Sequence, residues 1–187
     1  MKIYTKKGDQ GLTQSWNGVS INKNSLELEV QGIADELISY LGIIKQKWIE
    51  FFEGEKSTQD FINNLQNKLF DLCAICSSEE KADSVLNIQE SMKTEFLEEM
   101  IDKYNDRLPP LKNFILPGDN HLSSQVHYCR AKVRTLERRV VALSENNSKI
   151  KDVIPLVNRS SDLFFVMARY ISIKSGKQDS QVSFTKR

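Results

Sequence analysis

The chain has 187 residues, with 26 lysines and arginines, 25 aspartates and glutamates, and a formal net charge of +1. This length is enough to bury a full hydrophobic core, and no change in composition divides it, so we expect a single domain over 1–187. Because the near-neutral charge supplies no broad positive field, we expect no nucleic-acid partner and no membrane partner. Any anion site must therefore be local.

Targeting signals and disulfides are not evident in the sequence. The opening residues, MKIYTKKGDQ, contain no apolar run of the kind that a secretory signal needs. The longest apolar stretch, residues 163–168, is far too short to span a bilayer. The odd count of three cysteines does not suggest a disulfide framework. These features predict a cytoplasmic protein.

Residues 1–24 lack helical periodicity and are expected to form an irregular arm. Its stretch KKGDQGLT, residues 6–13, combines lysines, glycines and a threonine, a composition suited to wrapping backbone N–H groups around phosphate. The stretch lacks the spacing of a Walker loop, and the motif alone fits a type I or II turn equally well. From these residues alone, a phosphate cradle and a simple turn both remain open.

Two helices are predicted next, because apolar residues recur at steps of three and four. Cys73 and Cys76 of the second helix form a CxxC, but no second ligand pair stands at zinc spacing, so we interpret both as core residues. The apolar stripe of the first helix is Val30, Ile33, Leu37, Leu41, Ile44 and Trp48, and that of the second is Ile62, Leu65, Leu69, Leu72 and Cys76.

The third helix is shorter and follows a connection rich in serine, glutamate and lysine. Ser91 can cap its start, and Pro109 with Pro110 ends it. The fifth helix begins near Asp152 and stops at Gly176. The apolar positions are Met92, Phe96, Met100 and Tyr104 in the third helix, Leu122, Val126, Cys129, Val133, Leu136, Val140 and Leu143 in the fourth, and Val157, Phe164, Ala168 and Ile171 in the fifth.

Five helices without convincing strand alternation predict an all-α bundle over residues 25–176, followed by a polar tail, 177–187. Asp35 of the first helix lies between core positions, so we expect a carboxylate close to the core that needs a cationic partner. An arginine such as Arg130 can supply one.

Polar side chains form a second stripe on each of the last two helices. A solvated helix face would explain either stripe alone, but if the two helices are neighbours, the stripes converge into one pocket. The stripe of the fourth helix is Arg130, Arg134, Glu137 and Arg138, and that of the fifth is Asn158, Asp162, Phe165 and Arg169.

Five stretches, in order along the whole chain, resemble the PduO-type ATP:cob(I)alamin adenosyltransferases. They are TKKGDQGLT, GIADEL, FILPG, CRAKVRTLERRV and IPLVNRSSDLFFVMAR. The resemblance implies a five-helix bundle that assembles as a homotrimer, with active sites between subunits. It also implies a reaction in which reduced cobalamin attacks the 5′ carbon of ATP to give adenosylcobalamin and triphosphate. A reductase and an adenosylcobalamin-dependent enzyme are the further partners that the family implies.

The resemblance assigns site residues by position. In this family the arm folds over ATP, and Mg²⁺ bridges the phosphates, with Glu137 as the carboxylate that orients the ion or a neighbouring arginine. Phe114 is expected to exclude the lower axial ligand of cobalt, and Asp35 with Arg130 to join two subunits on the corrin side. The implied ATP-binding residues are Thr5, Lys6, Lys7, Gly8, Thr13, Gln14, Lys23, Arg134, Arg138 and Asn158, and the implied catalytic residues are Arg130, Arg134, Glu137 and Asn158.

The chain departs from the family pattern at three positions. Ser20 replaces an arginine after Trp16-Asn17-Gly18, Thr135 replaces the second of two arginines, and Asp119 replaces the second glycine of an LPGG turn. Asp119 is expected either to reshape the corrin-side loop or to cap the fourth helix. These changes motivate an alternative function, in which a weakened relative binds or delivers adenosylcobalamin, or senses ATP, without turnover. A ferritin-like di-iron bundle is disfavoured because the sequence has no Glu-x-x-His pairs.

Overall fold

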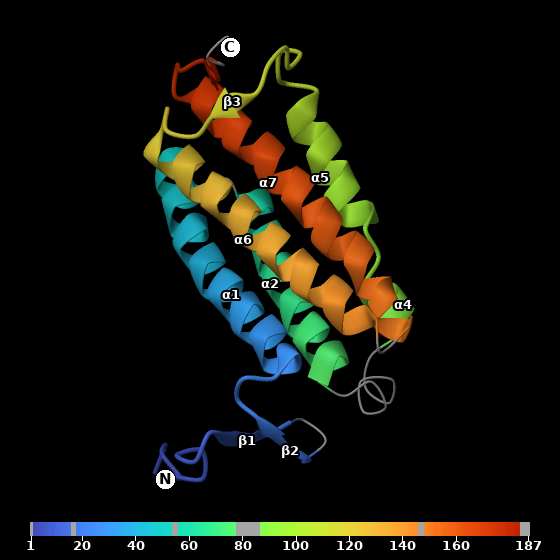
Figure 1. Cartoon of the computed structure of the whole chain (residues 1–187). Helices are drawn as coiled ribbons and strands as arrows, with labels where there is room; N and C mark the ends of the chain where they lie inside the picture. Colours follow the sequence, from blue (N-terminus) through green and yellow to red (C-terminus); the bar gives the residue numbers. More distant parts are fainter. Residues whose placement is uncertain (1, 16–17, 54–55, 78–86, 146–147, 184–187) are drawn as a thin grey trace.

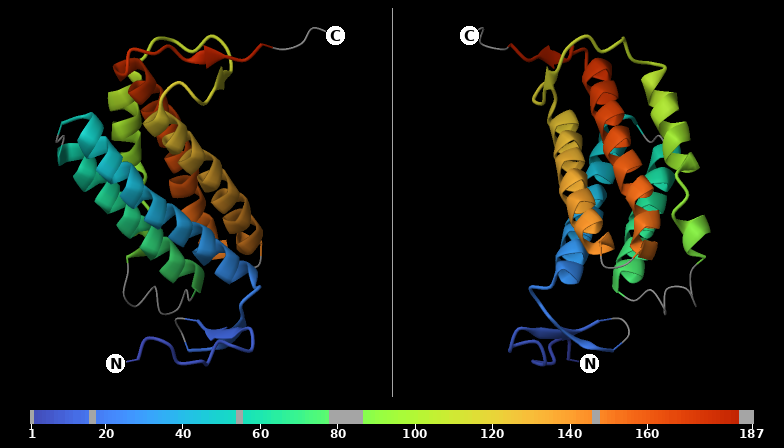
Figure 2. Two further views of the ribbon diagram at one scale, coloured as in Figure 1. Left: turned by 90° about the vertical axis from the view of Figure 1, so that its left-hand side faces the viewer. Right: turned by 45° about the vertical axis from the view of Figure 1, so that its right-hand side comes forward.

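Helices make up most of the computed structural model, which describes residues 2–15, 18–53, 56–77, 87–145 and 148–183. Four long helices lie side by side along the molecule, and the shorter α5 packs on α7 (Figures 1 and 2). The predicted bundle of five helices is confirmed. The five are α1 (Leu26–Phe51), α2 (Lys56–Ser77), α5 (Glu95–Asn105), α6 (His121–Ser144) and α7 (Ile154–Lys174).

The apolar stripes predicted from the sequence form the core. Every stripe residue of α1, α2 and α7 is buried, and the stripe of α6 is buried through Val140. Trp48 of α1 is fully buried, with its ring 4.4 Å from that of Phe52 and 5.9 Å from that of Tyr104 in α5. Tyr104 also shares a 3.0 Å hydrogen bond with Thr58 of α2. This aromatic cluster therefore joins three helices.

The third predicted helix begins later than expected. Ser91 is the last residue of a single turn, α4 (Ile88–Ser91), and α5 starts at Glu95 after Thr94 in the N-cap position. The Ser91 hydroxyl donates to the carboxylate of Asp71 in α2. The prediction that Ser91 caps this helix is wrong, because its hydroxyl serves a contact between helices. The connection expected before it, residues 78–86, lies outside the described residues.

The last helix follows its prediction closely. A 3₁₀ turn (Ser148–Val153) leads into α7, and Pro155 stands in the first turn, where its missing N–H is harmless. The prediction that the two cysteines of α2 belong to the core is also confirmed, since Cys76 is buried and Cys73 is half-buried against the core. Burial raises the pKa of Cys76 to about 12 and that of Cys73 to about 11, which keeps both thiols protonated.

Two small antiparallel sheets correct the expectation that the chain has no strands. In the arm, β1 (Leu12–Gln14) pairs with β2 (Ser20–Asn22), so the arm is a hairpin and not wholly irregular. At the other end of the bundle, β3 (Ile115–Leu116) pairs with β4 (Ser180–Gln181). Strands of two or three residues are too short to give an alternating pattern. The two sheets lie at opposite ends of the molecule (Figures 1 and 2).

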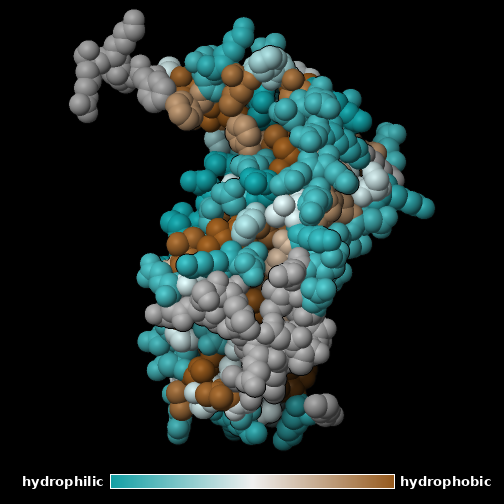
Figure 3. All heavy atoms as spheres, turned by 90° about the vertical axis from the view of Figure 1, so that its right-hand side faces the viewer, coloured by the Kyte–Doolittle hydropathy of each residue, from teal (hydrophilic) through white to brown (hydrophobic). Residues whose placement is uncertain are grey.

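The surface carries few large apolar side chains, and several of these gather at one end. Leu111, Phe114 and Leu116, all close to β3, are 47%, 73% and 51% exposed. Figure 3 shows a largely hydrophilic face, with hydrophobic surface at its upper end and further hydrophobic patches midway down and near its lower end. Among the helices that the structure describes, none combines the length and apolar character that crossing a bilayer requires.

Candidate functional site

The arm folds around a hollow. Its volume is about 360 Å³, and its lining combines backbone, hydroxyl, amide and lysine groups. Five of the arm residues assigned to ATP line it together, so the structure brings them to one place. Lys6 has a φ of 60°, which turns the chain at the start of the motif. The lining residues are Thr5, Lys7, Gly8, Leu12, Thr13, Gln14 and Ser20.

Lys23 closes one side of this arm. Its Nζ donates a 2.8 Å hydrogen bond to the carbonyl oxygen of Gly8, and its backbone N–H donates to Gly11 over 2.9 Å. Gly11 has a φ of +79°, so this position favours glycine. A Cβ on Gly8 would stand 2.9 Å from Lys23 Nζ, so a larger residue there would displace the end of the lysine side chain. The lysine therefore brings a positive charge to the edge of the hollow and holds the motif in its turn.

Glu137 of α6 and Asn158 of α7 meet, as the two polar stripes predicted. Asn158 Nδ2 donates to Glu137 Oε1 over 2.9 Å, and both side chains are half-buried. Arg134 and Arg138, on the same side of α6, are exposed. In the described part of the chain Arg134 makes no ion pair, whereas Arg138 donates to Thr135 Oγ1 over 3.1 Å. The surface between α6 and α7 thus carries two exposed cations beside a fixed amide–carboxylate pair.

Arg169 does not join this pair, which corrects the expectation for the end of the stripe. It is 4% exposed, and its Nε lies 2.7 Å from Asp179 Oδ2 in the tail. Sequence reasoning instead missed Arg159, which donates to Asn158 Oδ1 over 3.4 Å and to Glu98 Oε1 of α5 over 3.0 Å. Its position directly after Asn158 was the only feature of the sequence by which we could have identified it as a site residue.

No hydrogen bond or ion pair joins Asp35 to Arg130 within the described part of the chain. Asp35 is exposed on α1, so the expectation of a carboxylate close to the core is wrong. Arg130 is half-buried, and its Nε is buried without a hydrogen-bond partner among the described residues. A buried guanidinium nitrogen without an acceptor is costly, so a partner supplied from outside the chain would satisfy it.

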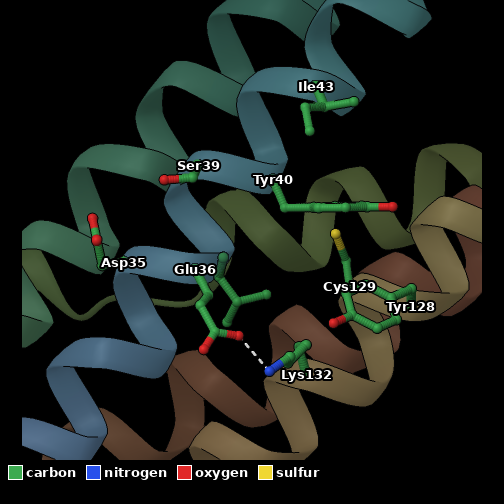
Figure 4. Close-up of a pocket in the computed structure, with 9 residues that line it drawn as sticks. Asp35, Glu36, Ser39, Tyr40, Ile43, Tyr128, Cys129 and Lys132 are labelled. Carbon is green, nitrogen blue, oxygen red and sulfur yellow. Dashed lines mark ion pairs between the residues drawn. The ribbon is translucent and has the colours of Figure 1, made fainter.

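Asp35 borders a groove between α1 and α6 with a volume of about 430 Å³ (Figure 4). The rings of Tyr40 and Tyr128, which both line it, pack against each other with their centroids 5.2 Å apart, and Lys132 forms an ion pair with Glu36. Apart from Asp35, no residue pattern indicated this groove, because it depends on how two helices that are distant in sequence pack.

Phe114 lies at the opposite end of the bundle from the arm. It precedes β3 and is 73% exposed. The 24 residues of α6 separate the two ends by about 36 Å at 1.5 Å per residue. A single chain therefore does not bring Phe114 near the hollow of its own arm.

A comparison with known protein families decides the relationship. The model of the family described as cobalamin adenosyltransferase matches residues 3–171. This chain belongs to the cobalamin adenosyltransferase family. It is 38% identical to a corrinoid adenosyltransferase of Bacillus subtilis (strain 168) over 183 residues, covering 96% of this chain and 91% of the relative. It is 36% identical to the human corrinoid adenosyltransferase MMAB over 182 residues, covering 95% and 72% respectively.

Solved structures agree with this family assignment. A variant PduO-type ATP:corrinoid adenosyltransferase from Lactobacillus reuteri, complexed with cobalamin and ATP, superposes with a TM-score of 0.86 and 32% sequence identity. The superposition covers 97% of this chain and 99% of that one. Both the family resemblance and the helical architecture expected from the sequence are therefore confirmed.

Ser20, Thr135 and Asp119, the three residues that depart from the family pattern, each occupy a defined place in this adenosyltransferase fold. Ser20 lies in β2 and lines the hollow of the arm, while Trp16 and Asn17 before it lie outside the described residues. Thr135 accepts from Arg138, as described above. Asp119 does not cap α6, because Asn120 does so by accepting from the N–H groups of the first turn. The carboxylate of Asp119 instead accepts hydrogen bonds from Ser180 in the C-terminal tail.

His127 of α6 is buried in a setting that disfavours its charged form. Its Nδ1 has no hydrogen-bond partner in the described ranges, and its ring packs edge-on to Phe165 at 6.1 Å. Burial, with the charge of Arg130 as the second cause, lowers the pKa of His127 to about 4, although Asp179 and Asp119 act in the opposite direction.

We expect this histidine to make the protein less stable in mild acid. The unfolded chain binds a proton at His127 near pH 6.5 and the folded chain near pH 4, so stability is lost as the pH falls through this window. His127→Gln should remove on the order of 2 kcal/mol of that loss between pH 7 and pH 4. Urea unfolding across this pH range measures it. His121→Gln, at an exposed histidine, is the control, and an equal effect of both variants would contradict the assignment.

Proposed function

We propose that this chain transfers the 5′-deoxyadenosyl group of ATP to the cobalt of cob(I)alamin and releases triphosphate. One observation carries the proposal beyond family membership: five arm residues with the chemistry of a phosphate site line a single hollow. The fixed pair of Glu137 and Asn158, flanked by exposed Arg134 and Arg138, supports it from the bundle. An amide can hold the nucleotide while guanidinium groups meet the phosphates.

The reaction makes one bond and breaks one. The cobalt(I) electron pair forms the Co–C bond with the 5′ carbon, the C–O bond to triphosphate breaks, and triphosphate leaves with that electron pair. Charge therefore builds up on the leaving oxygen, and fixed cations that face it lower the barrier. Lys23, Arg134 and Arg138 are the cations that would do so. A direct displacement requires no general base, since the reacting carbon loses no proton.

Mg²⁺ would accompany the triphosphate. It prefers oxygen ligands and is commonly held by substrate phosphates with one or two carboxylates. Glu137 fits this role, because only its Oε1 has a partner within the described chain, which leaves Oε2 to reach the ion or its waters. No three residues of the types His, Cys, Asp or Glu cluster in metal-binding geometry in the described ranges, which is compatible with an ion held mainly by phosphate. When bound, the ion neutralises phosphate charge.

Phe114 would serve the cobalt side of the reaction. Cobalt(II) in cobalamin is hard to reduce while a lower axial ligand remains, and an apolar wall that excludes this ligand makes reduction easier. Phe114, Leu111 and Leu116 present exposed apolar surface of this kind. A reductase partner would supply the electron, and an adenosylcobalamin-dependent enzyme would receive the product.

A homotrimer with shared sites fits the geometry of the single chain. Phe114 and the arm lie at opposite ends of a bundle whose helix α6 is about 36 Å long, so a neighbouring subunit would bring ATP and cobalamin together. Asp35 is exposed, and Arg130 has an unpartnered Nε, so the pair can form between subunits. Sedimentation analysis of the purified protein would test the trimer.

An anaerobic assay with chemically reduced cobalamin and ATP tests the activity. We expect a light-sensitive Co–C product and one triphosphate for each turnover. Tight ATP binding without product would instead favour the alternative of a relative that binds ATP or adenosylcobalamin without turnover. Absence of both ATP binding and product would remove the proposal altogether.

Lys23→Met should raise the KM for ATP about tenfold with a smaller change in kcat, because the variant loses one cation near phosphate and the tie to Gly8. Thermal unfolding should not change, since Lys23 is exposed and lies outside the helical core. Steady-state kinetics at varied ATP measures the effect. Lys47→Met, at an exposed ion pair on α1, is the matched control. An unchanged KM in the Lys23 variant would remove this lysine from the ATP site.

A further inference from the structure

The C-terminal segment 178–183 is fastened to the loop that carries Phe114. This loop, residues 109–119, connects α5 to α6, and β4 lies along it as the partner of β3 (Figures 1 and 2). In the β3–β4 pair, Leu116 stands opposite Ser180, and the N–H of Val182 donates to the carbonyl oxygen of Phe114 itself over 2.9 Å. Asn113 Nδ2 adds a 2.8 Å bond to Gln181 Oε1. The tail therefore holds the backbone of Phe114 and of the strand after it, and the side chain of Asn113 before it.

A buried ion pair anchors the start of this tail. Arg169 of α7 is 4% exposed, its Nε lies 2.7 Å from Asp179 Oδ2, and its Nη2 donates to the carbonyl oxygen of Pro109 over 2.9 Å. One guanidinium thus holds both the tail and the first residue of the loop. Because Asp179 and Arg169 are both largely buried, this anchor fixes the direction in which the tail leaves α7.

A second tie, at the far end of the loop, comes from Asp119. Its Oδ2 accepts from the backbone N–H of Ser180 over 3.1 Å, and its Oδ1 accepts from the Ser180 hydroxyl over 2.5 Å. Both carboxylate oxygens therefore bind one residue of β4, which only a side chain with two acceptors can do. Glycine, which the family pattern has at this position, cannot make either bond.

We propose that Asp119 is a positioning residue for Phe114, which acts by holding Ser180 and so keeping β4 paired with β3. The loop carries a largely exposed apolar side chain, and the backbone at Phe114 is bound by Val182 of the tail. The proposal rests on the proposed function, in which Phe114 excludes the axial ligand of cobalt. It concerns the tail, which lies beyond the residues, 3–171, that match the family model.

The contacts of Asp119 are exposed, so they contribute little to the stability of the whole fold. Their loss should instead let the loop sample other positions. The effect should therefore appear in the step that depends on Phe114 and not in ATP binding at the opposite end of the bundle.

The test compares full-length variants in two anaerobic assays, one starting from cob(II)alamin with a mild reductant and one from chemically prepared cob(I)alamin. Asp119→Ala should lower the rate of the first about fivefold and leave the second, and the KM for ATP, within about twofold. Asp119→Asn, which keeps one acceptor oxygen, should recover most of the rate. Ser180→Ala, which removes only the hydroxyl donor, should give a smaller loss in the same assay. Ser183→Ala, an exposed serine of the same tail, is the matched control.

A double-variant cycle asks whether Asp119 acts through Phe114. If it does, Asp119→Ala should have no further effect in a Phe114→Ala background. Additive losses, or equal losses in both assays, would overturn the proposal.

A spectroscopic readout keeps the test independent of turnover. The electron paramagnetic resonance spectrum of bound cob(II)alamin reports whether a nitrogen ligand remains on cobalt. Asp119→Ala should increase the nitrogen-coordinated fraction relative to the unaltered protein. An unchanged spectrum would contradict the proposal, whereas absence of product from cob(I)alamin in the unaltered protein would contradict the proposed function alone.

Discussion

Arg134→Ala is expected to lower kcat/KM for adenosyl transfer about 100- to 1,000-fold, the loss typical of removing one fixed donor to a developing charge. Arg134 is exposed on α6 and makes no ion pair within the described residues, so its charge is available to the leaving triphosphate. For the same reason its removal should not disturb the fold. Anaerobic kinetics and thermal unfolding together measure the two outcomes.

Two further variants sharpen this prediction. Arg134→Lys keeps the charge but loses the planar fork that binds phosphate through two bonds, so we expect an intermediate loss. Arg139→Ala, which removes an exposed ion pair to Glu29 on another side of the same helix, should change activity less than twofold. Unaltered turnover in Arg134→Ala would remove this residue from the site, and an equal loss in Arg139→Ala would indicate a general effect of charge.

Phe114→Ala is expected to separate the two cobalamin assays. The reaction from cob(II)alamin should fall about 100-fold, whereas the reaction from cob(I)alamin and the binding of ATP should change little. The reason is that an axial ligand retained on cobalt lowers the reduction potential, and a one-electron potential change of about 120 mV corresponds to a factor of about 100.

The loop around Phe114 supplies the controls for this prediction. Phe114→Leu keeps an apolar side chain and should retain most of the activity from cob(II)alamin. Leu111→Ala removes another exposed apolar side chain of the same loop and should have a small effect. Equal damage by Phe114→Ala in both assays would mean that the residue has a general structural role.

Most of the helical fold could be predicted because its signal is local. A core stripe such as the one from Val30 to Trp48 requires only that apolar residues recur at the period of a helix. The start of α5 could not be predicted in this way, because the Ser91 hydroxyl binds Asp71 of a different helix. The strands β3 and β4 are two residues long and pair across more than 60 residues of sequence, so neither pattern nor spacing indicated them.

The candidate site was predictable to a similar extent. The polar stripes of α6 and α7 placed Glu137 and Asn158 on facing sides, and their 2.9 Å hydrogen bond confirms that convergence. The burial of Asp35 was mispredicted, because a helix position beside the core can still point outward. The partner of Asp119 could not be found from sequence, since Ser180 lies 61 residues away.

A crystal structure with ATP and cobalamin bound is the measurement that tests the account most directly. We expect the triphosphate to contact Gly8 and Thr13 of the arm and the guanidinium of Arg134, with the 5′ carbon facing a corrin whose lower face meets Phe114 of a neighbouring subunit. A triphosphate bound elsewhere, with the Arg134 side chain in solvent and the hollow of the arm empty, would contradict it.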